Sequence, residues 1–173
     1  MSTGPIYLDH NGTTPVDAEV LDAMLPFLRE HFGNPSSTTS LGHAAREAIE
    51  TARAEVASLI GATASEIIFT GGGTEASNHA IRGFAAVAPP GRRTIVTSTV
   101  EHPATEMPCR RLEREGFAVK RIPVDRDGVV DVGAARDVIG PETALVTIIH
   151  AQMCRAVTKP SSEAPPFVVA RAA

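Results

Sequence analysis

A glycine cluster that leads into a helical pattern has the clearest chemical meaning in the sequence. A β-like run over residues 66–69 precedes it, and the stretch reads Phe69-Thr70-Gly71-Gly72-Gly73-Thr74-Glu75-Ala76-Ser77-Asn78. Glycines let the backbone approach a bulky oxyanion, the first N–H groups of a helix point toward it, and the Thr74 hydroxyl adds a donor. The pattern favours a phosphate-bearing ligand, with a plain strand-to-helix turn as the alternative.

Polar residues also follow two other apolar runs. Glu101 and His102 come after residues 94–98, and His150-Ala151-Gln152 comes after residues 143–149. In a parallel sheet, ligands bind beyond the carboxyl ends of the strands, so these residues and the glycine cluster can share one cleft. His102 suits proton transfer because imidazole changes its charge near neutral pH. The alternative interpretation of His102 is a residue that begins a helix.

The remaining reactive side chains give weaker signals. The two cysteines, Cys109 and Cys154, make no disulfide framework, and no Cys/His spacing resembles a zinc site. We interpret both cysteines as residues without a reactive role. The basic residues are nearly all Arg, and the only lysines are Lys120 and Lys159.

The composition is that of one globular domain. The 173 residues are 43% hydrophobic and 21% charged, which allows a core and argues against disorder over most of the length. A net charge of −4 provides no basic surface, so neither nucleic acid nor a membrane is expected as a partner. The sequence has no run of about 18 apolar residues and no signal-peptide pattern after Met1, so we expect a cytoplasmic protein.

Helical and strand patterns alternate along the chain. Thr14 is the expected cap of the first helix and Gly61 the expected end of the second. Apolar spacing predicts helices over residues 16–32, 41–60, 74–86, 103–115 and 132–139. Strands are predicted over residues 66–69, 94–98, 117–124 and 143–149. The alternation predicts an α/β fold with a mostly parallel sheet and flanking helices.

Five segments, taken in order, resemble the cysteine desulfurase and selenocysteine lyase group of class V aminotransferase-like enzymes, which use pyridoxal 5′-phosphate (PLP). The resemblance covers about residues 6–152 and implies an incomplete large domain of a PLP enzyme of fold type I. The segments are Tyr7-Leu8-Asp9-His10-Asn11-Gly12-Thr13-Thr14-Pro15, Gly33-Asn34-Pro35-Ser36-Ser37, Ile68-Phe69-Thr70-Gly71-Gly72-Gly73-Thr74-Glu75, Val100-Glu101-His102 and His150-Ala151.

The resemblance assigns roles to several of these residues. It implies that Gly73 and Thr74 hold the PLP phosphate, and that His102 stacks on the cofactor ring and assists proton transfer. Glu75 resembles the family residue at the start of the cofactor helix, where the helix dipole favours a carboxylate, and we expect a structural part for it. Asn11, Thr13 and Thr14 resemble the active-site border, with a turn and helix cap as the alternative. The loop Gly33 to Ser37 has a turn interpretation beside a substrate-side or dimer-contact role.

The sequence departs from the family after residue 151. An Asn-Asn-Glu-Thr-Gly-like turn is expected there, but the chain has Gln152-Met153-Cys154-Arg155-Ala156, so Gln152 is left as a partial substitute for the cofactor contact. The resemblance also implies that the Schiff-base lysine, the nucleophilic cysteine, an aspartate and an arginine lie beyond residue 173. Neither Lys120 nor Lys159 matches that lysine.

These features divide the chain into three expected parts. Residues 1–15 form an N-terminal arm, residues 16–152 form a partial PLP-binding large domain, and residues 153–173 form a divergent, disordered tail. Three prolines and the absence of periodicity argue against an ordered element in the tail before Phe167.

The resemblance implies a cysteine desulfurase reaction, in which L-cysteine or selenocysteine gives alanine and an enzyme persulfide. The expectation is an N-terminal or truncated form of such an enzyme, homo-oligomeric and inactive as an isolated chain. The alternative is a non-catalytic module that associates with a full-length homologue or binds a phosphate ligand. A nucleotide-binding domain is disfavoured, because the glycine spacing is not Gly-x-Gly-x-x-Gly and no P-loop lysine follows.

Overall fold

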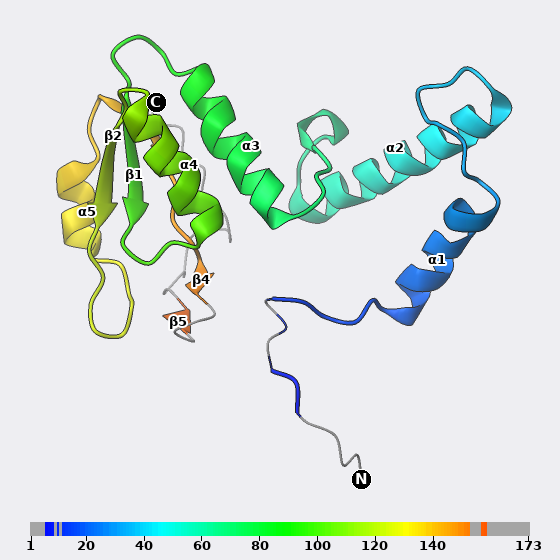
Figure 1. Cartoon of the computed structure of the whole chain (residues 1–173), viewed down its shortest axis with the longest axis horizontal. Coiled ribbons are helices and arrows are strands. Elements are labelled where there is room, and N and C mark those ends of the chain that lie inside the picture. Colours follow the sequence, from blue (N-terminus) through cyan, green and yellow to red (C-terminus); the bar gives the residue numbers. More distant parts are fainter. Residues whose placement is uncertain (1–5, 9, 11, 153–156, 159–173) are drawn as a thin grey trace. The chain divides into compact units, whose positions relative to one another are not determined.

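The chain divides into two compact units, Met1–Phe69 and Thr70–Ala173, which we describe separately. Figure 1 shows the computed structural model, which describes residues 6–8, 10, 12–152, 157 and 158. None of the helices in this described part is both long and apolar enough to cross a membrane.

The second unit contains a parallel sheet, as the sequence predicts. It has three strands, β1 (Thr94–Ser98), β2 (Ala118–Ile122) and β3 (Thr143–Val146), in the order β2-β1-β3. Both pairings are parallel, with Val96 opposite Lys120 on one side and Val146 on the other. All five residues of the central strand β1 are buried, which suits a strand that is covered on both faces.

Helices cover both faces of this sheet (Figure 1). On one face, α3 (Gly73–Ala86) and α4 (Pro103–Arg114) pack against each other and over the strands. On the other, α5 (Val132–Val138) contacts β2. Neighbouring residues of β2 show the two faces: Lys120 donates to Val138 O of α5, and Arg121 binds Glu106 and Glu113 of α4. The buried core lies between the α3–α4 layer and the sheet and consists of Ile81, Ile95, Cys109, Leu112, Phe117 and Leu145.

Beyond β3 the backbone forms a short antiparallel pair, β4 (Ala151–Gln152) with β5 (Val157–Thr158). The prediction that no ordered element precedes Phe167 is therefore wrong at residues 157–158. Antiparallel pairing satisfies backbone groups without any apolar periodicity, so the sequence pattern gave no signal for it. The rest of the expected tail, residues 153–156 and 159–173, lies outside the described residues.

The first unit is helical. It contains α1 (Ala18–Arg29) and α2 (Ser40–Ile60), and α2 ends at Gly61 in the left-handed conformation (φ 70°) that the sequence predicts. The predicted cap of α1 is wrong: the Asp17 carboxylate accepts from the Glu19 N–H at 2.9 Å, whereas the Thr14 hydroxyl bonds the His10 ring at 3.0 Å. A carboxylate is the better partner for the first turn of a helix, because it also interacts favourably with the helix dipole.

The predicted strand over residues 66–69 is wrong as well. A single 3₁₀ turn, η1 (Ala64–Glu66), occupies its start, and the following residues form no strand. The Glu66 carboxylate accepts from the Thr63 N–H at 2.8 Å, a capping arrangement that bends the chain where the pattern suggested extension. Arg53 of α2 then holds the segment, donating to Ile67 O at 2.6 Å and lying over the Phe69 ring at 4.9 Å.

Candidate functional site

The glycine turn at the start of α3 has the geometry of an anion cradle. Gly72 caps the helix with φ 158° and ψ 176°, a backbone conformation that residues with a Cβ atom rarely adopt. The turn is held from both sides: the Gly71 N–H donates to Glu75 Oε2 at 2.5 Å, and the Thr70 hydroxyl donates to Gly72 O at 3.2 Å. Glu75 thus has the structural part that the sequence predicts.

The donors of this cradle remain available. The N–H groups of Gly73, Thr74 and Glu75 precede the first helical bond of α3, which runs from the Ala76 N–H to Gly72 O at 3.0 Å. No acceptor within the described part of the chain contacts those three groups or the Thr74 hydroxyl. A Cβ added at Gly73 would meet no atom within 4 Å, so the turn is open to an approaching oxyanion. The residues present therefore fit a phosphate group.

His102 has the helix-starting position of the alternative interpretation, and its role in proton transfer stays a prediction. It is the N-cap of α4, and its Nδ1 accepts from the Ala104 N–H at 3.0 Å. The neutral ring consequently carries its proton on Nε2. The side chain is exposed, so capping the helix does not prevent the ring from meeting a ligand.

The sheet brings the His102 turn and the segment leading to Gln152 together. The ladder between β1 and β3 ends with the Thr147 N–H donating to Val96 O at 2.9 Å, so the two segments leave the sheet as neighbours. Gln152 itself lies in β4. In Figure 1 the start of α3 points to the same end of the sheet as the arrowhead of β1. This end is where parallel sheets bind ligands.

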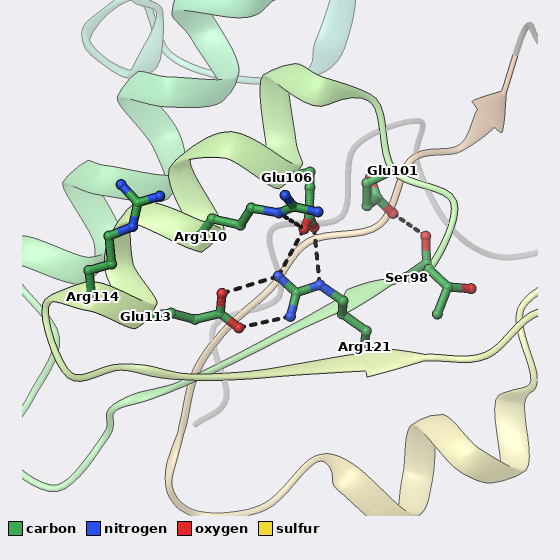
Figure 2. A pocket seen from close by; sticks show the side chains of 8 residues that line it. Ser98, Glu101, Glu106, Arg110, Glu113, Arg114 and Arg121 are labelled. Carbon is green, nitrogen blue, oxygen red and sulfur yellow. Dashed lines mark hydrogen bonds and ion pairs between the residues drawn. The ribbon is translucent and has the colours of Figure 1, made fainter.

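A pocket of about 720 Å³ lies near this end of the sheet and is lined by residues of α4 and of the ends of β1 and β2. Figure 2 shows Arg121 between Glu106 and Glu113, with Arg110 also directed at Glu106. Of the residues that the sequence predicts at the site, Glu101 lines this pocket, whereas Gly73, Thr74 and His102 do not. The lining residues are Ser98, Thr99, Glu101, Glu106, Arg110, Glu113, Arg114 and Arg121. The Glu106 to Arg110 spacing of four residues is readable in the sequence, but the contribution of Arg121 from β2 is not.

Ion pairs join four of the charged residues that line the pocket. Arg121 lies 3.0 Å from Glu106 and 2.8 Å from Glu113, and Arg110 lies 2.7 Å from Glu106. Desolvation acts to raise the pKa of Glu106, but the hydrogen bonds from Arg121 and Arg110 outweigh it and hold the pKa below its usual value. The Glu113 and Glu106 carboxylates raise the pKa of Arg121 further above neutrality. Such a network suits a structural brace rather than a general base.

Cys109 is not a nucleophile in this structure. Its side chain is fully buried in the core, and burial, followed by the nearby Glu106 carboxylate, raises the thiol pKa to about 11. Because the thiolate is the reactive form, a thiol at neutral pH is inert. Cys154 lies outside the described residues.

The N-terminal motifs belong to the first unit. Asn11 is outside the described residues, and Thr13 lies near the chain start, where its carbonyl accepts from the Tyr7 hydroxyl at 3.0 Å. The loop from Gly33 to Ser37 is a closed turn at the start of α2. Arg46 donates to Pro35 O at 2.8 Å and to Ser37 O at 3.2 Å. These contacts support the turn interpretation, and the substrate-side or dimer role stays a prediction.

The chain is an α/β protein with a parallel sheet and a glycine turn, shaped like an anion cradle, at the start of a helix. The sequence profile of the family described as Aminotransferase class-V matches residues 6–163, so the chain belongs to that family. This match extends 11 residues past residue 152, the last residue covered by the motif resemblance.

Named relatives narrow the class. The chain is 48% identical over 146 residues to "Cysteine desulfurase IscS" of Dictyoglomus turgidum, covering 84% of this chain and 37% of that protein. It is 55% identical over 148 residues to "Cysteine desulfurase" of Cereibacter sphaeroides, covering 84% and 38%. The solved structure of a "NifS-like protein" superposes with a TM-score of 0.80 at 39% identity, covering 85% of this chain and 40% of that one. The chain therefore has cysteine desulfurase homologues and spans less than half of their length.

Proposed function

We propose that this chain is the phosphate-binding, N-terminal part of a PLP-dependent cysteine desulfurase. The whole enzyme would release sulfur from L-cysteine as an enzyme persulfide, leaving L-alanine, to supply iron–sulfur clusters or thiolation. The observation that carries the proposal is the open cradle at Gly73 and Thr74, at the position where the family motif requires a phosphate site.

In this proposal each site residue has a defined task. The N–H groups of Gly73 and Thr74, with the Thr74 hydroxyl, would hold the cofactor phosphate. The exposed ring of His102 would lie against the cofactor ring, presenting the Nε2 proton because Nδ1 is occupied by the Ala104 N–H. Gln152 would supply a partial polar contact. PLP, when bound, supplies an electron sink for the substrate carbon.

The isolated chain is not expected to turn over substrate. Lys120 Nζ donates to Glu142 Oε1 at 3.0 Å and to Val138 O at 3.3 Å on the α5 face, whereas α3 lies on the opposite face. The Lys120 amine is thus bound on the face of the sheet opposite α3. Lys159 lies outside the described residues. Cys109 is buried as a thiol, so we assign neither covalent cofactor attachment nor sulfur transfer to the described residues.

The substrate is L-cysteine, with selenocysteine as the second candidate, and the protein is a homo-oligomer. The exposed apolar side chains of α1, such as Leu28, support association. We place the protein in the cytoplasm, although one relative is named "Probable cysteine desulfurase, mitochondrial", from Dictyostelium discoideum. The same exposed face also supports the second candidate, a non-catalytic module that associates with a full-length homologue.

Titration of the purified chain with PLP tests the cradle. PLP should bind more tightly than pyridoxal, which lacks the phosphate, and inorganic phosphate should compete. Thr74→Val should weaken PLP binding about tenfold, the effect of losing one hydrogen bond to a charged group. Thr51→Val, at an exposed threonine of α2, is the matched control and should leave binding unchanged.

Three results would separate the alternatives. Equal affinity for PLP and pyridoxal would overturn the cradle assignment. Borohydride should remove the cofactor spectrum without attaching cofactor to the protein, and covalent attachment would contradict the assignment of Lys120. Binding of phosphate without preference for PLP, together with co-purification of a longer homologue, would favour the non-catalytic module.

A further inference from the structure

Glu101 joins two segments that are distant in the sequence. Its carboxylate accepts from the Ser98 hydroxyl, as Figure 2 shows, and both of its oxygens lie 3.0 Å from the Ile149 backbone nitrogen. Ser98 ends β1, and Ile149 lies beyond the end of β3. One half-buried side chain thus bonds both to its own turn and to a backbone group 48 residues further along the chain.

The position of this contact gives it structural weight. The backbone ladder between β1 and β3 stops at the bond from the Thr147 N–H to Val96 O, so the Ile149 N–H has no strand partner. Glu101 provides that N–H with a charged acceptor, and hydrogen bonds to charged groups are the stronger kind. The side chain therefore extends the connection between the two strands beyond their ladder.

The same turn is fixed on its other side. The Thr99 N–H donates to Ile122 O of β2 at 3.0 Å. His102 follows Glu101 directly and begins α4, where its carbonyl accepts from the Thr105 N–H at 2.9 Å. The segment that carries His102 is consequently tied to β2 through Thr99 and to the end of β3 through Glu101.

We propose that Glu101 is a positioning residue that holds the His102 turn against the segment entering β4, so that the two sides of the cofactor cleft keep a fixed separation. Glu101 acts through its neighbours and does not itself meet the cofactor. The inference rests on the proposed function for its link to PLP, whereas the clamp between the two segments rests on the contacts alone.

Three variants separate the parts of this clamp. Glu101→Ala removes both contacts. Glu101→Gln keeps an acceptor for the Ile149 N–H and a polar partner for Ser98, so it should rescue the clamp. Ser98→Ala removes only the hydroxyl and leaves the Ile149 contact in place.

Hydrogen exchange of the cofactor-free chain, followed by mass spectrometry, measures the clamp. Glu101→Ala should raise the exchange rate of the peptide containing residues 147–150 about tenfold, while peptides from β1 keep their protection. Glu101→Gln and Ser98→Ala should stay within about threefold of the unaltered chain. Unchanged exchange in Glu101→Ala would overturn the clamp, and equal loss of protection throughout β1 would show a general stability role instead.

The PLP affinity and the induced circular dichroism of bound PLP test the link to the site. Glu101→Ala should weaken PLP about tenfold and reduce the induced signal, and Glu101→Gln should restore both. His102→Asn, which retains a helix-capping side chain, should reduce the signal without changing exchange at residues 147–150. Faster exchange with unchanged PLP affinity would overturn the link to the cleft. If the unaltered chain does not bind PLP, the proposed function fails, and the exchange measurement still decides the clamp.

Discussion

The two units use their apolar residues in opposite ways. In the second unit β1 is buried throughout, and large side chains such as Ile95, Leu112 and Leu145 form a shared core between helices and sheet. In the first unit α1 has no buried residue, and the only buried residues of α2 are Gly42, Ala45 and Ala57. A sheet with helices on both faces has its apolar residues buried within the unit, whereas an amphipathic helix needs a partner to bury its apolar stripe.

This difference bears on the candidate site. The glycine turn at the start of α3 and His102 both belong to the unit that has a core, so a packed sheet holds the elements that carry them. The N-terminal motifs, including the loop at Gly33, belong to the unit whose apolar side chains stay exposed. The glycine turn and the histidine of the candidate site are therefore held in place by the core of a single unit.

The largest expected effect comes from removing a core side chain. Leu112→Ala, at a residue with 4% exposure, should lower the free energy of unfolding by about 3 kcal/mol because it leaves a cavity between α4 and the sheet. Leu28→Ala in α1, at 69% exposure in the single chain, should change it by less than about 0.5 kcal/mol at protein concentrations where the chain is monomeric. Urea-induced unfolding followed by far-ultraviolet circular dichroism measures both.

Equal losses in the two variants would contradict the comparison between the units. They would show that α1 is covered in solution, by the rest of the chain, by a second copy or by another protein. Sedimentation of both variants separates these cases, because cover by a second copy or by another protein requires an assembly larger than one chain.

A smaller effect is expected from the pocket network, with a defined dependence on pH. Glu106→Gln should cost about 2 kcal/mol at pH 7, because Arg121 and Arg110 lose a charged acceptor. The pKa of Glu106 is lowered in the folded state, so its contribution is present above the unfolded pKa of about 4.3 and is lost as pH falls through the folded value. The unaltered chain should therefore lose stability more steeply than Glu106→Gln as the pH falls below about 5.

Glu66 provides the matched control in the first unit. Its pKa is also lowered, first by the backbone hydrogen bond from Thr63, but it is fully exposed and a Gln can fill the same capping position. Thermal unfolding measured at several pH values should show little change for Glu66→Gln. A pH slope of Glu106→Gln identical to that of the unaltered chain would contradict the role assigned to Glu106.

Local sequence signals predicted most of the elements. The bounds of β1 agree with the prediction, because a short β-branched run between turn residues has few other interpretations. The ends of α2 and α4 were also readable, since Gly61 and Gly116 adopt the positive φ angles that helix ends favour. The positions of Gly73 and His102 at the starts of two helices were readable for the same reason, whereas their roles at the site stay predictions.

Features that depend on distant contacts were not readable. Arg121 looks like an ordinary strand residue, and only the packing of β2 on α4 places it between Glu106 and Glu113. The contact from Glu101 to Ile149 likewise needs the parallel pairing of β1 with β3. The error at residues 66–69 has a local cause, because the Thr63 to Glu66 capping arrangement competes with an extended backbone.

The smallest expected effect compares two glycines in the same conformation. Gly61 ends α2 at φ 70°, and Gly116 follows α4 at φ 88°, so an alanine at either position is disfavoured by about 1 kcal/mol. Neither added Cβ meets a close contact: Gly61 has no atom within 4 Å, and Gly116 has only Arg93 Nη2 at 3.7 Å. The local backbone strain is therefore the same at both positions.

A difference in hydrogen exchange between the two variants then measures how far the destabilisation spreads within each unit. Gly116→Ala should raise hydrogen exchange throughout β1 and β2, because the core unfolds as one unit, whereas Gly61→Ala should raise exchange only near the end of α2. Exchange that spreads through all of α2 in Gly61→Ala would show that the first unit is as cooperative as the second.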